Sequence, residues 1–207
     1  NKVYLKYLFY ISLLTISALI ISKTNDDFSY YHLPFTKYLT EQKIIFGMGH
    51  LNHGFNLLSS LFFLNSTFYL PLVKFFSFHF SLLFFLIFFN FFVLKEIFTK
   101  KKNKIIKYLY LFSFLFFNLS FNRIAEYGTD KVGQLLIVVL IIKLFELVCF
   151  SQKRTLEKIL YLLPLFGFCI TLKTYFLSYV LLGFVLIFMN NHIKKNFNYI
   201  IFSKSFL

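Results

Sequence analysis

The chain has 207 residues, of which 58% are hydrophobic and 14% charged, and its 22 lysines and arginines outnumber 8 acidic residues, for a net charge of +14. Apolar runs of about twenty residues, the length of a membrane-spanning helix, recur along it, so we do not expect a soluble domain. The basic residues cluster in short segments between these runs, a bias typical of cytoplasmic loops rather than of a nucleic-acid-binding surface. We therefore predict an all-α, polytopic membrane protein whose partners include membrane lipids and no nucleic acid.

Six apolar runs predict six transmembrane helices. They cover residues 3–22, 72–94, 108–119, 132–150, 159–170 and 175–189. The lysine-rich segment 95–107 follows the second run, and short cytoplasmic loops carry such an excess of lysine. Both ends of the chain are therefore predicted to be cytoplasmic, with residues 23–71 outside, in the inner or plasma membrane of a bacterium. We predict one membrane domain over residues 1–207 and expect it to be the N-terminal part of a longer protein.

The long first external loop is too apolar to be disordered and should carry amphipathic or interfacial helices. Residues 28–43 predict one such helix, bent or broken at Pro34, because proline removes a backbone donor and crowds the preceding turn. Its aromatic residues recur at intervals of three and four, as on one helix face: Phe28, Tyr31, Phe35 and Tyr38. Residues 47–54 are rich in glycine and should be irregular, and residues 55–70 predict a helix lying at the membrane surface.

With this topology, polar side chains from three segments fall on the extracytoplasmic side. They are Asp26 and Asp27 after the first span, Arg123, Glu126 and Asp130 around the second external loop, and Lys173 between the last two spans. The planar fork of an arginine matches phosphate oxygens, and a lysine adds a point charge. A nearby carboxylate can accept a proton from an attacking hydroxyl. The pattern predicts a transferase with an anionic leaving group.

Simpler interpretations stand beside this one. Asp26 and Asp27 are also residue types that cap helix N-termini, and sequence neighbours do not face each other on a helix. We prefer Asp27 of the two, because it lies nearer the aromatic segment. His32 is as well explained by packing at the interface as by substrate contact. Inside the fourth span, Lys143 and Glu146 are three residues apart and should pair with each other.

We predict no cofactor and no metal site. His50 and His53 have a spacing that a metal-binding turn permits, and a nearby aspartate would complete a divalent site. Two histidines in a glycine-rich polar loop are, however, more often solvated or hydrogen-bonded. The metal therefore remains the lesser alternative.

The order of these segments resembles the GT-C-type glycosyltransferases that use polyprenyl-phosphate-linked sugars, such as the protein O-mannosyltransferases and the lipid A aminoarabinose transferases. In those families an external acidic motif and a tyrosine-rich helix follow the first span, as in Asp26-Asp27-Phe28-Ser29-Tyr30-Tyr31. A second external loop carries an arginine and then an acidic residue, resembling Arg123 to Asp130. A hairpin of two short spans has a Leu-Thr-Lys-like apex, resembling Thr171-Leu172-Lys173-Thr174. The chain would form a divergent branch of this group.

The resemblance implies transfer of a sugar from a polyprenyl-phosphate carrier on the extracytoplasmic side. Asp27 or Asp26 would be the catalytic base, and Arg123 and Lys173 would hold the lipid phosphate. Tyr31 and His32 would line the same site. The spacing from arginine to aspartate is one residue longer than in the family pattern, so Glu126 and Asp130 are both candidates for the second acidic position.

Two rival functions remain open. A transporter or lipid flippase would place charges near the bilayer midplane and use broken helices in paired repeats. A membrane scaffold or assembly protein would tolerate the loss of Asp27, Arg123 or Lys173 with no effect beyond stability. The acidic residues lie at the boundary of the predicted spans, which favours the enzyme.

Overall fold

The computed structural model describes residues 2–20, 26–43, 46–56, 59–99, 102–120, 129–150 and 155–189. The longer helices of these parts are α1 (Lys2–Ile20), α2 (Leu33–Glu41), α3 (Ser60–Thr67), α4 (Phe80–Phe98), α5 (Lys104–Ser120), α6 (Thr129–Phe150), α8 (Leu163–Leu172) and α9 (Leu177–Met189). The short elements are η1 (Phe28–His32), η2 (Met48–His50), η3 (His53–Asn56), η4 (Phe75–His79), α7 (Thr155–Leu160) and η6 (Thr174–Phe176). The described residues contain no strand, which confirms the all-helical prediction.

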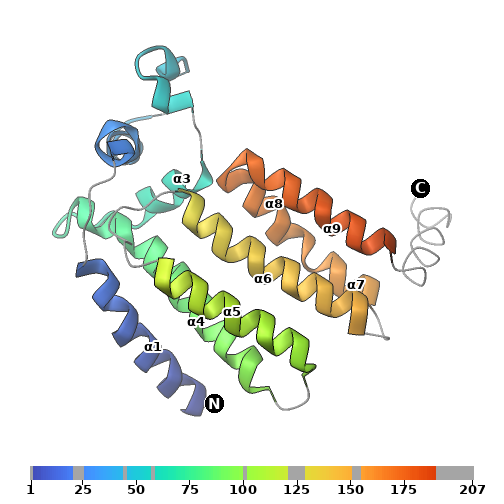
Figure 1. Ribbon diagram of the computed structural model, residues 1–207. Helices are drawn as coiled ribbons and strands as arrows, with labels where there is room; N and C mark the ends of the chain where they lie inside the picture. Colours follow the sequence, from blue (N-terminus) through green and yellow to red (C-terminus); the bar gives the residue numbers. More distant parts are fainter. Residues whose placement is uncertain are drawn as a thin grey trace.

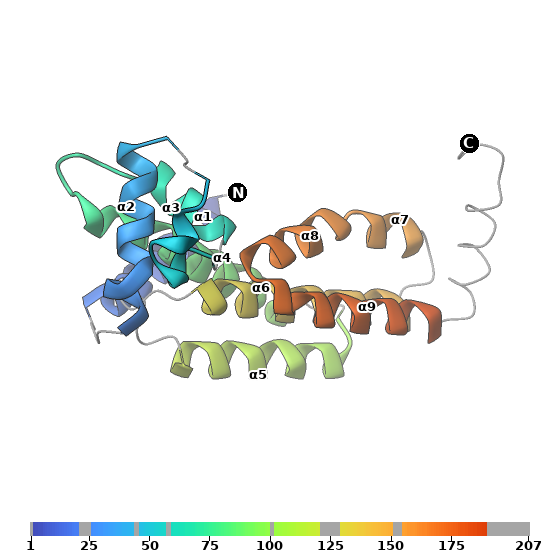
Figure 2. The same cartoon turned by 90° about the horizontal axis from the view of Figure 1, so that it is seen from above.

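Six lengthwise segments lie side by side and alternate in direction: α1, α4, α5, α6, α7 with α8, and α9 (Figure 1). The short helices α2 and α3 stand at one end of this bundle (Figures 1 and 2). We call it the α2 end; here α6 begins and α8 gives way to α9. At the opposite end, the α7 end, α4 gives way to α5 and α6 finishes near α7. Segments far apart in the sequence therefore meet at each end.

Two helical stretches among the described residues are long and apolar enough to cross a membrane. They are Phe75–Phe98, which joins η4 and α4, and Asp130–Phe150, which is most of α6. Shorter apolar helical stretches cover Tyr4–Ile16, Lys158–Leu172 and Thr174–Val185. The structure thus provides two candidate spans by length and composition.

The helices of the structure differ from the bounds of two predicted spans, and each difference has a local cause. The second helical stretch begins at Phe75, not residue 72, because the chain turns sharply before it and Lys74 adopts a positive φ of 55°. The fifth predicted span, 159–170, is two helices: α7 ends at Leu160 and α8 starts at Leu163, with Pro164 in its first turn. Proline cannot donate to the carbonyl four residues earlier, that of Leu160, and it suits the first turn of a new helix.

The helix predicted to be bent or broken at Pro34 changes from π-helical to α-helical geometry just before this proline. The chain runs from the π-helical turn η1 directly into α2, and Pro34 lies in the first turn of α2. Proline leaves the carbonyl of Tyr30 without its usual α-helical donor, and the side-chain amide of Asn52 donates to that oxygen at 3.1 Å. A Cβ on Gly54 would lie 2.5 Å from the Tyr31 side chain, so this glycine lets the loop pack closely there. The glycine-rich segment, which consists of turns and the short elements η2 and η3, therefore packs against the junction of η1 and α2.

The buried apolar residues that the structure describes form three clusters. One lies between α4, α5 and α6 and includes Leu82, Val93, Ile106 and Val132. A second lies between α6, α8 and η6 and includes Ile137, Leu144, Cys169 and Phe176. The third, a small aromatic cluster, joins the predicted stripe to α3 through Tyr31, Phe35 and Phe62. Because α6 borders both large clusters, its two ends are held firmly with respect to the neighbouring helices.

Candidate functional site

An ion pair joins two segments at the α2 end of the bundle. Lys173 Nζ donates to Asp130 Oδ1 at 2.5 Å, across 43 positions of sequence. The two side chains are 37% and 43% exposed, so solvent and a soluble or lipid headgroup can reach both. An exposed pair of this kind adds little to stability.

Local structure fixes where Lys173 lies. Its backbone is extended (φ −161°, ψ 132°) and forms the single-residue break between α8 and η6. Its neighbours Leu172 and Phe176 are fully buried, and its own amide donates to the carbonyl of Cys169 at 3.3 Å. Asp130 lies in the first turn of α6, where the partial positive charge of the helix N-terminus favours a carboxylate.

Gly133 allows these two segments to come together. It is buried one turn after Asp130, and a Cβ at this position would lie 2.0 Å from the ring of Phe176. A side chain here would push the start of α9 away from α6. The close approach of Gly133 and Phe176 therefore sets the geometry of the Asp130–Lys173 pair.

Tyr31 connects this pair to the acidic segment before α2. Its ring is 7% exposed and lies edge-on to Phe62 in the aromatic cluster. Burial raises the pKa of Tyr31 above its usual value, and the negative charges of Asp27 and Asp130 raise it further. The phenol therefore stays neutral at physiological pH and is influenced by carboxylates from two distant segments. A neutral phenol can donate a hydrogen bond to an anionic ligand.

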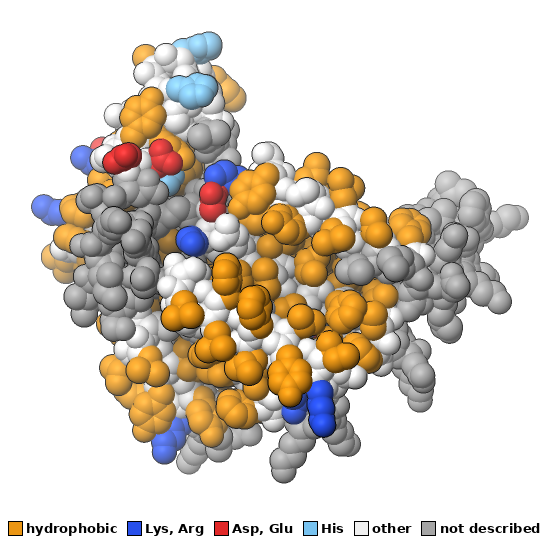
Figure 3. Space-filling model, viewed as in Figure 1, with side chains coloured by type: hydrophobic (Ala, Val, Ile, Leu, Met, Phe, Trp, Pro, Cys, Tyr) orange, Lys and Arg blue, Asp and Glu red, His pale blue; other side chains and the backbone are white. Residues whose placement is uncertain are grey.

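Asp26 and Asp27 are exposed and form the helical turn that precedes η1. Capping does not explain Asp27, because its side chain makes no capping hydrogen bond to η1. Figure 3 shows acidic and basic side chains gathered where the α2 region meets the bundle, above a largely hydrophobic face. The charges of Asp27 and Asp130 both act on Tyr31, so Asp27 lies at the same end of the molecule as the Asp130–Lys173 pair.

The structure places the predicted histidines in two settings. His32 is 3% exposed and its ring lies against Tyr31 and Phe62, as the packing interpretation expects. His50 and His53 occupy consecutive short turns and are exposed. Within the described ranges, no three His, Cys, Asp or Glu side chains come together as a metal site would require.

Two further contacts at this end were not foreseen. Lys173 Nζ lies over the ring of Tyr175, 5.7 Å from its centroid. In the sequence, this contact is indicated only by the position of Tyr175, two residues after the lysine. Thr171 Oγ1 donates to Ser60 Oγ at 3.0 Å and so ties α3 to the end of α8. The predicted residues Arg123 and Glu126 lie outside the described residues.

The α7 end holds a second polar cluster. The predicted pair is confirmed, with Lys143 Nζ 3.0 Å from Glu146 Oε2. Lys102 Nζ is 3.1 Å from the same oxygen and also pairs with Glu96, which lies 3.7 Å from Lys143. Sequence spacing predicts the Lys143–Glu146 pair within α6. It does not predict the contacts with Glu96 and Lys102, because these residues belong to the end of α4 and the loop that follows it.

In the described part of the chain, charged clusters lie at both ends of one helical bundle, and the cluster at the α2 end includes acidic groups from the segment after α1. Comparisons with curated proteins and with solved structures gave no match. A family model described as a domain of unknown function (DUF8201) matches residues 1–207. The chain belongs to this family.

Proposed function

We propose that this protein is a membrane-embedded glycosyltransferase that moves a sugar from a polyprenyl-phosphate carrier to an acceptor on the extracytoplasmic side. The observation that carries the proposal is the meeting, at the α2 end, of Lys173, Asp130 and Tyr31 with the acidic segment at Asp27. An anionic leaving group needs a cation, and an attacking hydroxyl needs a base. This end of the molecule supplies both.

The proposed membrane placement uses all six lengthwise segments as spans. The two long apolar stretches fit a bilayer directly, whereas α5 with 17 residues would extend about 25 Å and needs a locally thinner bilayer or flanking lysines. Lysines at the α7 end favour the cytoplasm for that end. The α2 end would then face the outside, in a bacterial inner or plasma membrane. Charges at both ends of the bundle also fit an enzyme at the bilayer surface better than a transporter.

In the proposed step, the acceptor hydroxyl gives its proton to the Asp27 carboxylate, with Asp26 as the alternative base. The acceptor oxygen attacks the anomeric carbon, and the bond from that carbon to the phosphate oxygen breaks. The electron pair leaves with polyprenyl phosphate, whose added negative charge Lys173 and Arg123 stabilise. Stabilising charge that develops in the transition state is a major source of rate. Tyr31 would donate a hydrogen bond beside the phosphate.

The ion pair suggests how the two acidic candidates divide their roles. Asp130 would hold Lys173 in place before the carrier binds, because the two are 2.5 Å apart. The phosphate would then compete with Asp130 for the ammonium group. Glu126 remains a candidate for a second contact to the donor. Asp130 is therefore proposed as a positioning residue.

Binding of polyprenyl phosphate to the purified protein tests the proposal. Thermal unfolding in detergent reports it, because a ligand bound only by the folded state raises the midpoint, by about 2.7 kcal/mol of stability at a hundred times Kd. Lys173→Ala and Arg123→Ala should each weaken binding about tenfold, the worth of one charge-assisted hydrogen bond. Lys37→Ala is the matched control, since Lys37 lies at the same end, is 62% exposed and pairs only with Glu41 in the described structure.

The outcomes separate the proposed function from its rivals. Saturable stabilisation that Lys173→Ala loses and Lys37→Ala keeps would support a carrier-lipid transferase. With a donor that supports turnover, Asp27→Asn should lower kcat by about a hundredfold while leaving carrier binding intact. An unchanged melting midpoint in the folded wild-type protein would argue for transport or scaffolding instead.

A further inference from the structure

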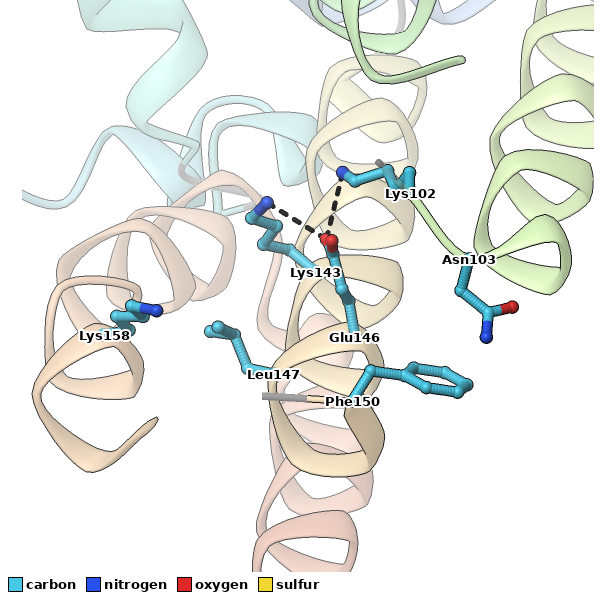
Figure 4. A pocket seen from close by; sticks show the side chains of 7 residues that line it. All are labelled: Lys102, Asn103, Lys143, Glu146, Leu147, Phe150 and Lys158. Atoms are coloured by element: carbon cyan, nitrogen blue, oxygen red, sulfur yellow. Dashed lines mark hydrogen bonds and ion pairs between the residues drawn. The ribbon is translucent and has the colours of Figure 1, made fainter. Parts of the chain in front are cut away.

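A pocket of about 750 Å³ opens at the α7 end of the bundle (Figure 4). Its walls come from the loop before α5, the last turns of α6, and α7. Three lysines and one acidic residue line it, namely Lys102, Lys143, Lys158 and Glu146. Its volume lies within the range of ordinary ligand sites. This pocket lies at the opposite end from the candidate transferase site and shares no residue with it.

The charges of the pocket are only partly balanced. Lys102 and Lys143 share the carboxylates of Glu146 and Glu96 through contacts of up to 3.7 Å. Lys158 makes no ion pair with any other described residue, and its side chain extends from α7 toward α6 (Figure 4). Among the described residues, the three lysines of the pocket stand against two carboxylates, Glu146 in its wall and Glu96 behind it, so one positive charge of this set is left over. An anion in the pocket would balance that charge.

One wall of the pocket is apolar. Leu147 lies between Lys158 and Glu146, and Phe150, which is 44% exposed, extends from the same turn of α6 toward the side of Asn103 (Figure 4). A soluble phosphate would gain nothing from this wall. A phospholipid has an anionic headgroup and an acyl chain attached to it, so it fits both surfaces.

We propose that the pocket binds the phosphate of an anionic phospholipid, with Lys158 and Lys143 contacting the headgroup and Phe150 contacting the acyl chain. The lipid would come from the leaflet at the α7 end, the cytoplasmic one in the placement proposed above. Basic pockets between helices on this side of a membrane are suited to anionic headgroups. The inference depends on membrane insertion and not on sugar transfer.

Lipid binding can be measured with the purified protein in detergent by titrating phosphatidylglycerol and, separately, phosphatidylcholine, and following the melting midpoint. Lys158→Gln should weaken phosphatidylglycerol binding about fivefold, since one lysine near a lipid surface contributes about that factor. Lys158→Arg should retain it. Lys104→Gln is the matched control, because Lys104 is exposed at the same end but does not line the pocket.

Saturable binding of phosphatidylglycerol, weakened by Lys158→Gln and unaffected by Lys104→Gln, supports the proposal. Equal weakening by both variants would indicate general surface charge and overturn it, as would equal binding of phosphatidylcholine. Glycerol phosphate that binds as tightly as the lipid would assign the pocket to a soluble phosphate and also overturn it. Lys158→Gln should leave the effect of polyprenyl phosphate unchanged, so failure here is distinguishable from failure of the transferase proposal.

Discussion

The two ends of the helical bundle hold their charges in different surroundings. At the α2 end, Asp130 and Lys173 form one ion pair and are 43% and 37% exposed. At the α7 end, four ion-paired side chains are much less exposed, Lys102 at 8%, Glu96 at 13%, Glu146 at 19% and Lys143 at 29%. The first arrangement is open to a ligand. In the second, four charged side chains pair with one another and are less exposed, and three of them line the pocket that Lys158 also borders.

This difference indicates that the two clusters contribute differently to stability and to ligand binding. An exposed pair contributes between about 0 and 1 kcal/mol to stability, so a role in binding fits the Asp130–Lys173 pair better than one in stability. A shielded network depends on all of its members, because removing one leaves another charge buried without compensation. Loss of a member of the paired network at the α7 end should therefore lower stability, whereas loss of the exposed pair at the α2 end should mainly affect binding of the carrier.

The largest expected effect is that of Glu146→Gln. This change removes the carboxylate that contacts both Lys102 and Lys143, so we expect a loss of about 3 kcal/mol in the free energy of unfolding. Denaturant unfolding in detergent, followed by circular dichroism, measures it. Glu41→Gln is the control, because Glu41 is 56% exposed and its pair with Lys37 should be worth less than about 0.5 kcal/mol. Equal losses for the two variants would contradict the proposed difference between the ends.

A smaller loss is expected for Gly133→Ala. The new methyl group would meet the ring of Phe176, and overpacking of this kind costs about 2 kcal/mol. Because the same contact sets the Asp130–Lys173 pair, the variant should also weaken polyprenyl phosphate binding, which the thermal shift measures. Gly167→Ala is the matched control, since no atom lies within 4 Å of the added Cβ and the residue is exposed within α8. A Gly133→Ala protein with unchanged stability would show that α6 and α9 adjust without strain.

Some features of both ends follow directly from the sequence. Regular apolar runs predict the all-helical fold. Because successive spans alternate in direction, the prediction also places Asp130 and Lys173 at the same end. The aromatic spacing around Tyr31 and Phe35 predicts a shared face, and both residues are buried together with Phe62. The three-residue spacing of Lys143 and Glu146 predicts their contact. In the last two cases, the spacing of residues along one helix determines the result.

Other features depend on tertiary contacts that no local pattern encodes. Glu96 lies inside a helix that the apolar pattern ended at residue 94, and it joins Lys143 only because α4 and α6 pack together. The Asn52 amide reaches the carbonyl of Tyr30 across 22 positions. Gly133 and Phe176 have no sequence signal, because their importance comes from the distance between two helices. The ion pair at Lys173 has the same origin.

The smallest expected effect is a dependence on pH at the α7 end. Burial lowers the pKa of Lys102 below its ordinary value of 10.5, and the positive charge of Lys143 lowers it further, while Glu146 opposes the shift. The unfolded chain therefore binds more protons than the folded protein between the lowered pKa and 10.5, so stability should rise with pH in that window. Comparing the free energy of unfolding of the wild type with that of Lys102→Met between pH 7 and about 9.5 isolates this contribution, because the variant should lack the rise. Lys104→Met, which changes an exposed lysine nearby, should keep it. A rise that persists in Lys102→Met would mean that another group of the α7 end carries the desolvated charge.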